Sequence, residues 1–457
     1  MHARTMHSNG GGAGGFGLAT SGIRHRRAEE NRVNFARSQT PLPGNSPLVA
    51  PAATPRSGLN WVYDPMTAES TPFHPSPASG LQTIAAREAA LLAPYAMRSA
   101  DSAGRQHAEP DHPYRGLYQR DRDRIVHSSA YRRLSGKTQV FTGNMGDYHR
   151  TRLTHTYEVA SIARTIGRAL RLNEDLIEAL ALFHDIGHPP FGHAGEDTLN
   201  ECLRQEGGFS HNRHALTLAQ ELEERYPEFP GLNLTAEVLA GQSTRADKHG
   251  TRAATISPLL EVQVVDLADS ATYDAHDTDD AVKLGFTTLD ELLDVPLVRD
   301  ADALVQHRSG QLTGKMRRAA IVHALIEIQV TDILDVARRD LLPRQFESAQ
   351  AARQADFRLQ TSESLGAKKR ELERYLFQRV YRHPRVVEVR LQAQTRLQSL
   401  FDHFSTRPES LPKKFQIRAQ NVGVGRAVGD YLAGMTDRYC DEEYQRLFGG
   451  LASDTPV

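Results

Sequence analysis

The chain has 457 residues, with 55 Lys and Arg against 56 Asp and Glu, so its net charge is −1. This balance gives no overall electrostatic reason to expect a nucleic-acid or membrane partner. Two cysteines, Cys202 and Cys440, exclude a disulfide framework and a thiolate zinc site. No run of about 18 apolar residues predicts a membrane-spanning helix, and the first thirty residues lack the apolar run of a signal peptide, so we expect a cytoplasmic protein. Composition leaves the 20 histidines unexplained.

Helical periodicity dominates the chain after an N-terminal segment that is rich in Gly, Ser, Pro, Thr and Ala. Residues 1–80 offer too little apolar surface to offset the entropy of ordering, which predicts a disordered tail. Apolar residues then recur at helical spacing, and alternating strand patterns and fixed-period repeats are nearly absent. The sequence therefore predicts an all-α protein. The helices are expected at 82–95, from 155 to 170, from 173 to 187, and at 259–285, 317–341, 366–403 and 424–447, with 342–365 and 405–412 between the last three.

Two histidines lie on the apolar faces of neighbouring predicted helices. His155 comes four residues before Val159, and His184 comes four residues after Leu180. A single histidine on such a face is usually a hydrogen-bonded core residue. Here Asp185 follows His184 directly, and burying all three groups together without a cation would leave polar atoms unsatisfied. Imidazole and carboxylate suit a divalent cation, Mn, Fe, Zn, Ni or Mg, among which the sequence does not distinguish.

The predicted helix at 259–285 supplies a further ligand. Asp266, Asp269, Tyr273 and Asp277 share one of its faces. Seven acids and no Lys or Arg lie between residues 261 and 280, which a solvated acidic face would also explain. That alternative fits Asp269 poorly, because this residue follows a run of apolar side chains. We therefore predict Asp269 as a metal ligand.

The segment after Asp185 is dense in Gly, Pro and polar side chains. Gly187, Pro189 and Pro190 indicate a rigid turn. His193 and Glu196 are three residues apart, a spacing that suits a general acid and its partner on one helical turn. His188 and His193 could instead stabilise developing negative charge on a phosphate.

Residues 115–152 are rich in arginine, which suits phosphate oxygens. The first half of this segment also reads as a surface helix whose arginines pair with its own aspartates. Arg152 differs, because it lies one turn before His155 and thus beside the predicted metal. No P-loop, GxSxG or GxGxxG motif accompanies these residues.

The order His155, His184-Asp185, Asp269 resembles the signature of HD-domain metal-dependent phosphohydrolases. More specifically, the chain resembles the deoxyguanosine triphosphate triphosphohydrolases and their bacterial dGTPase-like relatives. The resemblance is continuous over about 115–285 and looser to about 447. It implies an HD-domain helical core at 81–300, additional helices in a C-terminal region at 301–457, and no counterpart for the tail at 1–80. The matching blocks are 120–130, 133–141, 149–155, 184–193, 209–212, 226–235, 265–269 and 273–277.

The resemblance implies that the chain hydrolyses a dNTP to a deoxynucleoside and inorganic triphosphate. A divalent metal would be held by His155, His184, Asp185 and Asp269. His193, with Glu196 behind it, would transfer a proton. The implied substrate contacts are His188, His211 and Arg152 with phosphates, Gln139 and Asp277 with the sugar 3′-hydroxyl, Tyr273 with the sugar, and Val140 at the base edge.

Two alternatives stay open from the residues. The metal site could serve another nucleotide, such as a nucleoside monophosphate or a cyclic dinucleotide. Alternatively, the chain could sense nucleotides or bind single-stranded DNA through its basic segment and the arginines of its tail, with salt-dependent affinity. The family resemblance also implies a homo-oligomer and a second dNTP as an activator in some members.

Overall fold

The computed structural model describes residues 82–449 except 113, 140–149 and 247–255. The predicted tail at 1–80 and the predicted base contact Val140 therefore lie outside the described residues. What is described falls within a single compact unit, Thr71–Val457.

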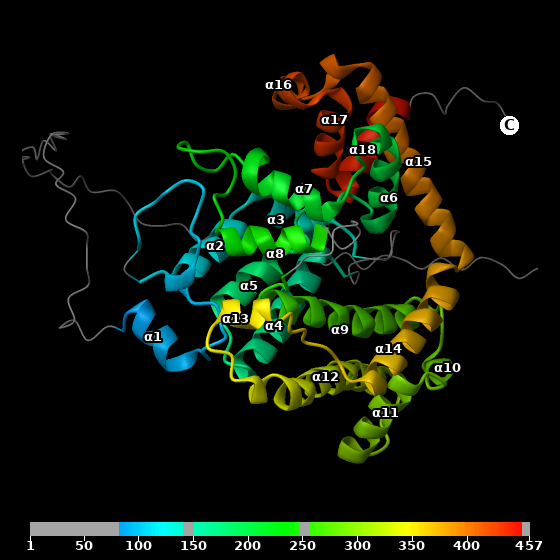
Figure 1. The fold of residues 1–457 in the computed structure, drawn as a ribbon. Coiled ribbons are helices and arrows are strands. Elements are labelled where there is room, and N and C mark those ends of the chain that lie inside the picture. The colour runs from blue at the N-terminus through cyan, green and yellow to red at the C-terminus, as the bar shows by residue number, and fades with distance from the viewer. Residues whose placement is uncertain (1–81, 113, 140–149, 247–255, 450–457) are drawn as a thin grey trace, which may run out of the picture. The chain divides into compact units, whose positions relative to one another are not determined.

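The described residues confirm the all-α prediction. They hold helices joined by short turns, and their only β-type pairing consists of isolated bridges. Figure 1 shows these helices in chain order from α1 to α18. Their bounds are α1 Ile84–Leu91, α2 Leu117–Val126, α3 Ser129–Arg133, α4 Arg152–Ala169, α5 Glu174–Phe183, α6 Gly192–Cys202, α7 His211–Thr217, α8 Ala236–Ala246, α9 Leu260–Lys283, α10 Leu289–Leu292, α11 Pro296–Ser309, α12 Gly314–Asp340, α13 Ala349–Gln354, α14 Glu363–Leu376, α15 Pro384–Thr406, α16 Lys413–Val422, α17 Val424–Ala433 and α18 Asp437–Phe448.

Helices α4, α5 and α9 form the central core that carries the predicted site. Thr151 and Asn173 begin α4 and α5, and each side chain accepts a hydrogen bond from a backbone N–H of the first turn. Both α4 and α9 pack on α5 and on each other. The apolar stripe predicted after His155 is buried there, since Val159, Ala163 and Ile166 are fully covered. The apolar residues whose spacing predicted these helices therefore form the face by which the helices pack together.

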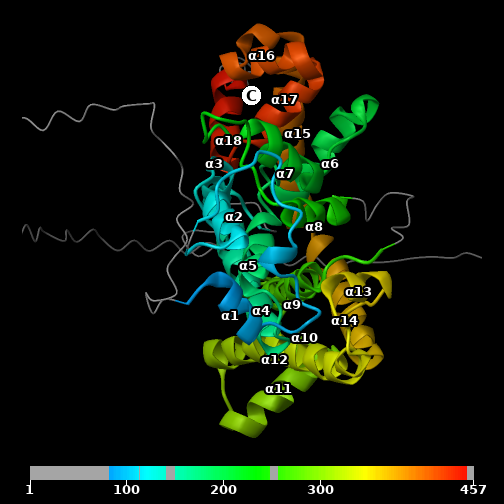
Figure 2. The same cartoon turned by 60° about the vertical axis from the view of Figure 1, so that its left-hand side comes forward.

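Two further apolar cores flank the central one. Helices α6, α15, α17 and α18 share a cluster that includes Leu199, Leu397 and Leu432. Helices α11, α12 and α14 share another with the C-terminal half of α9. Figure 2 shows α15 to α18 beside α6, with α11 and α12 on the opposite side of α9. The loop after His184 runs from the central core to α6, so two cores position it.

Two of the predicted helical stretches are interrupted. The stretch at 366–403 ends at a π-helical turn, Phe377–Tyr381, and a new helix starts at Pro384. Proline lacks the N–H that a continuous helix needs and disfavours helical backbone before it. The stretch at 424–447 breaks at Gly434, after which Thr436 caps α18. The sequence reading also missed α11, and the boundary predicted at residue 300 falls inside that helix, which packs on α12.

The basic segment and the acidic helix pair with other charges of the chain. Arg122 pairs with Asp123 within this helix, but Arg120 pairs with Glu109 and the buried Asp121 pairs with Arg105, so the alternative of a helix that pairs with itself holds only in part. Arg150 lies 3.5 Å from Asp279 and 3.6 Å from Asp280, which joins the two segments directly. Among the described residues, no helix has the length and apolar character needed to cross a membrane.

Candidate active site

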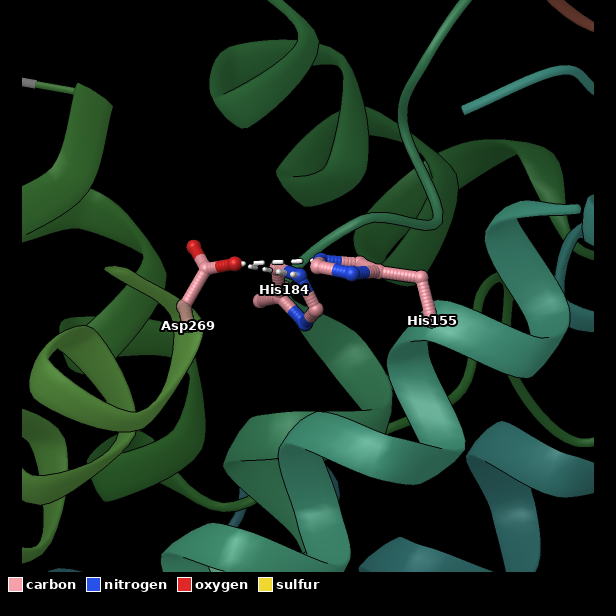
Figure 3. A group of neighbouring side chains, drawn as sticks. All are labelled: His155, His184 and Asp269. Atoms are coloured by element: carbon pink, nitrogen blue, oxygen red, sulfur yellow. Dashed lines mark hydrogen bonds and ion pairs between the residues drawn. The ribbon is translucent and has the colours of Figure 1, made fainter. Parts of the chain in front are cut away.

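His155, His184 and Asp269 come together from three elements. They are supplied by α4, by the residue that ends α5, and by α9, respectively. Nε2 of His155 lies 3.1 Å from Oδ1 of Asp269, and Nε2 of His184 lies 3.8 Å from the same oxygen. The three side chains point toward one another in Figure 3. One nitrogen or oxygen of each lies within 4.8 Å of the others, so the three can share one cation.

His184 provides the clearest test of whether these residues fit a metal. Its Nδ1 lies 2.6 Å from the carbonyl oxygen of Ala181, to which it donates. Its Nε2 is buried and has no hydrogen-bond partner. Burial lowers the pKa of His184, so the ring is neutral and Nε2 carries a lone pair. A buried, unpaired acceptor that faces carboxylates is costly unless a cation lies between them. The donor set therefore fits a divalent metal.

Asp185 lies beside this group, in contact with His184. Its Oδ1 is 3.4 Å from Nε2 of His184 and 3.0 Å from Nδ1 of His188. Its Oδ2 accepts a 2.9 Å hydrogen bond from Arg152. Burial opposes ionisation of Asp185, but the neighbouring His188, His184 and Arg152 outweigh it and hold its pKa well below the ordinary value. Asp185 is thus an ionised group next to the other three ligands and tied to the arginine predicted to contact phosphate.

A tight turn carries the chain from His188 to α6, the helix that holds His193. Phe191 adopts a left-handed conformation with φ of 63°, and Gly192 follows with φ of 58°. A non-glycine residue in this region costs free energy, so surrounding contacts must hold the turn. Arg152 approaches closely, because a Cβ on Gly192 would lie 3.0 Å from its Nη2. Arg152 also donates to the carbonyl oxygen of Gln139.

His188, His193, Glu196 and His211 gather on one side of this turn. The rings of His188 and His211 stack with centroids 3.7 Å apart, and those of His188 and His193 lie edge to face at 6.1 Å. One nitrogen or oxygen each of His188, His193 and Glu196 lies within 4.8 Å of the others. The hydrogen bonds of Glu196 go to His211, whose Nδ1 is 2.8 Å from Oε1 and whose backbone N–H is 2.9 Å from the same oxygen. His188, His193 and His211 thus all lie near Glu196, and His211 is the one that is hydrogen-bonded to it.

Tyr273 and Asp277 lie one and two turns after Asp269 on α9. Their side chains meet Tyr381, whose hydroxyl forms hydrogen bonds with both. Asp277 is 1% exposed, and its Oδ1 has no hydrogen-bond partner. Burial raises the pKa of Asp277 to about 7. Gln139 is likewise buried with an unpaired Oε1. Both residues predicted to hold the sugar hydroxyl therefore carry an oxygen that lacks a partner.

A cavity of about 270 Å³ opens beside the metal-ligand candidates. Its lining includes His184, Asp185, Asp269, His211 and Tyr273, all of them predicted from the sequence. The structure thus brings these five to one cavity.

The chain matches two families of known proteins. Residues 152–274 match the family described as the HD domain, and residues 359–446 match the phosphohydrolase-associated domain. Three bacterial relatives are each named deoxyguanosinetriphosphate triphosphohydrolase-like protein. The one from Geobacter metallireducens is 40% identical over 370 residues, which cover 79% of this chain and 96% of the relative. Those from Ralstonia pickettii and Thiobacillus denitrificans are 42% identical over 372 and 366 residues, covering 78% of this chain and 94% and 97% of the relatives.

The chain belongs to the deoxyguanosinetriphosphate triphosphohydrolase-like family. The resemblance stated from its motifs is thereby confirmed. The HD-domain match begins at Arg152 and includes all four predicted metal ligands. The phosphohydrolase-associated match includes Tyr381, whose hydroxyl donates to Asp277.

Several residues of this family member's site escaped the sequence reading. Arg245 lines the cavity and pairs with Asp266 at 2.7 Å. Tyr381 and Asp437 contact site residues from the C-terminal region. His276 lies inside the matched block at 273–277 and contacts His155 at 3.3 Å. His276 lies seven residues after Asp269, which is two helical turns along the same face of α9. This spacing was the signal that could have placed His276 near the metal-ligand candidates.

Proposed function

We propose that the chain is a metal-dependent phosphohydrolase that converts a dNTP, dGTP or dNTPs generally, to a deoxynucleoside and inorganic triphosphate. The observation that supports this most is the buried, unpaired Nε2 of His184 facing Asp269 and Asp185 beside an open cavity. The names of the relatives point to the same reaction. Members of an HD-domain family with these donors are well suited to phosphate-ester hydrolysis.

In this proposal His155, His184, Asp185 and Asp269 hold the divalent cation. The cation would supply a Lewis acid for an α-phosphate oxygen and lower the pKa of a water nucleophile. Arg152 keeps Asp185 ionised and fixed, since it donates to Oδ2 while Oδ1 faces the histidines. With its guanidinium bonded to Asp185 and to the Gln139 carbonyl, Arg152 orients the site as well as offering positive charge to phosphate.

The cluster around Glu196 supplies the proton transfer. Burial opposes ionisation of Glu196, but the hydrogen bonds and the charge of His211 lower its pKa well below the ordinary value. An ionised Glu196 accepts from Nδ1–H of His211, which orients that ring. We keep His193 as the proposed donor to the leaving 5′ oxygen and assign His211 with His188 to the phosphates.

The sugar end of the proposed substrate lies along α9. Tyr273 lines the cavity next to Asp269, and Tyr381 holds it against Asp277. The unpaired Oδ1 of Asp277 and Oε1 of Gln139 are the proposed partners of the 3′-hydroxyl. A residue built to bond this hydroxyl discriminates strongly against a substrate that lacks it.

A product assay tests the proposal. Purified full-length protein is incubated with Mn²⁺ or Mg²⁺ and each dNTP, singly and in pairs, and deoxynucleoside and inorganic triphosphate are measured. We expect both products in equal amounts, and none from His184→Ala. Monophosphate with pyrophosphate, or no product from any single dNTP or pair, would contradict the proposal.

Assembly into a homo-oligomer and a cytoplasmic location stay predictions, and the paired dNTPs test the predicted activator. The same protein titrated with single-stranded DNA at two salt concentrations tests the DNA-binding alternative.

A further inference from the structure

A second histidine lies directly behind His155. While Nε2 of His155 faces Asp269, its Nδ1 lies 3.3 Å from Nδ1 of His276, and the two rings are tilted by 71°. His276 is 2% exposed and is absent from the lining of the cavity beside the ligands. It therefore contacts the metal-ligand candidate without facing the substrate cavity.

The other nitrogen of His276 bonds to a carboxylate. Its Nε2 forms a hydrogen bond with Oε2 of Glu158, which lies three residues after His155 on α4. Arg150 contacts the other oxygen of Glu158 at 3.2 Å. Burial alone would raise the pKa of Glu158. The hydrogen bond from His276 and the charge of Arg150 outweigh burial, so the net pKa is lowered and the carboxylate is ionised. A line of contacts thus runs from Glu158 through His276 to His155.

With both rings neutral, only one arrangement of protons satisfies this line. The Glu158 carboxylate can only accept, so Nε2 of His276 carries a hydrogen. With Nε2–H bonded to Glu158, the neutral His276 ring presents Nδ1 as an acceptor toward His155. Nδ1 of His155 must then donate, which leaves a lone pair on Nε2 of His155, 3.1 Å from the Asp269 carboxylate. A lone pair against a carboxylate oxygen is favourable only with a cation between them.

Both ligand-candidate histidines are neutral rings with a lone pair on Nε2, and each is held in this form by a different partner. His184 donates its Nδ1–H to the Ala181 carbonyl, the common backbone arrangement. His155 instead needs a second side chain, because its N–H faces a ring nitrogen. Loss of that ring would leave His155 free to rotate and to place a hydrogen on the wrong nitrogen.

We propose that Glu158 and His276 are positioning residues that fix His155 in the orientation and tautomer that bind the divalent cation. The inference rests on the proposed metal centre, and it assigns a role to two residues outside the ligand set. Outer partners of metal-binding histidines typically contribute about 10- to 100-fold to metal affinity.

Metal affinity of the full chain tests the relay. Metal-stripped wild type, His276→Leu, His276→Asn and Glu158→Leu are titrated with Mn²⁺ by calorimetry, and the visible spectrum of bound Co²⁺ reports the ligand set. We expect His276→Leu to bind Mn²⁺ about 10- to 100-fold more weakly with a changed Co²⁺ spectrum. His276→Asn should lose less, since its amide oxygen can accept from Nδ1–H of His155. Glu178→Leu is the matched control, because Glu178 on α5 pairs with Arg122 of α2 rather than with a ligand, and this variant should bind Mn²⁺ as wild type does.

The outcomes separate the relay from the metal centre itself. If wild type binds no Mn²⁺ or Co²⁺, the proposed function is wrong. If wild type binds and His276→Leu and Glu158→Leu match it in Kd and spectrum, the relay is wrong. A purely structural role would lower the melting temperature of the metal-free protein and leave the Kd unchanged. If His276→Leu does not fold, Glu158→Leu decides, since that side chain is 44% exposed and its loss leaves the core intact.

Discussion

The backbone N–H of Phe191 donates a 2.8 Å hydrogen bond to Oδ1 of Asp437, a residue 246 positions later in the chain. The other carboxylate oxygen of Asp437 accepts from the N–H of Thr138 at 2.9 Å. Phe191 is the left-handed residue before α6, the helix that holds His193, and Thr138 precedes Gln139. One carboxylate at the start of α18 therefore holds two segments of the site in register.

Asp437→Asn should slow the reaction without weakening metal binding. An amide offers one acceptor and turns its NH₂ toward the other N–H, so one of the two bonds is lost. Because small displacements of a catalytic group cost rate steeply, we expect kcat for dNTP hydrolysis to fall about tenfold, with Mn²⁺ affinity unchanged. Asp441→Asn is the control, since Asp441 lies one turn later on α18 and pairs with Arg396 away from the site. Equal kcat in the two variants would show that Asp437 does not position the turn.

Gly187→Ala should destabilise the fold at the site. A Cβ at this position would lie 2.0 Å from the carbonyl oxygen of His211 and 2.5 Å from the N of Ala215, both of them backbone atoms that cannot turn aside. We expect the free energy of unfolding to fall by about 2 kcal/mol or more, measured with urea. The same change at Gly366 meets only the side-chain ends of Arg370 and Thr361, at 3.4 and 3.6 Å, and should stabilise α14 by about 0.5–1 kcal/mol. A Gly187→Ala variant as stable as wild type would contradict the close packing of α7 on this loop.

The grouping of His155, His184 and Asp269 was predictable, because apolar periodicity and neighbouring residues mark each of these positions in the sequence. His155 lies on an apolar stripe of α4, His184 ends α5 next to Asp185, and Asp269 interrupts an apolar run of α9. Local sequence determines each of these features, so the sequence alone predicts a metal site. The predictions failed where one local signal decided between a continuous and a broken helix, as at Pro384.

Contacts between distant segments were not predictable from local pattern. Lys137 is buried and donates to the carbonyl oxygens of His188 and Ala433, and nothing near it in sequence indicates either partner. Arg150 was read as part of a phosphate-binding segment, but in the structure it pairs with Glu158 and the acids of α9. Such assignments depend on how helices pack, which the charge pattern of one segment does not contain.

Arg245→Gln should weaken substrate binding and leave the metal bound. Arg245 lines the cavity with His184 and Asp269, and its charge opposes protonation of both. Loss of the Arg245 positive charge removes repulsion against a metal cation bound nearby, so Mn²⁺ affinity should stay equal or rise. Removing it from a triphosphate pocket costs about 1.5 kcal/mol, which is about tenfold in KM. Steady-state kinetics and calorimetry check the two directions, and a weaker Mn²⁺ affinity with unchanged KM would contradict the assignment.

Asp277→Asn should change how stability depends on pH. Burial raises the pKa of Asp277 to about 7 in the folded chain, while an unfolded aspartate titrates near 3.8. Between these values the folded state binds the extra proton, so wild-type stability falls as pH rises through this window. Asparagine resembles the protonated form at every pH and lacks this loss. Relative to wild type, the variant should therefore gain about 2–3 kcal/mol in the free energy of unfolding between pH 5 and pH 8. Urea denaturation of both proteins at the two pH values measures the difference, in which all other titrating groups cancel. A difference that does not change with pH would show that Asp277 is ionised in the folded protein.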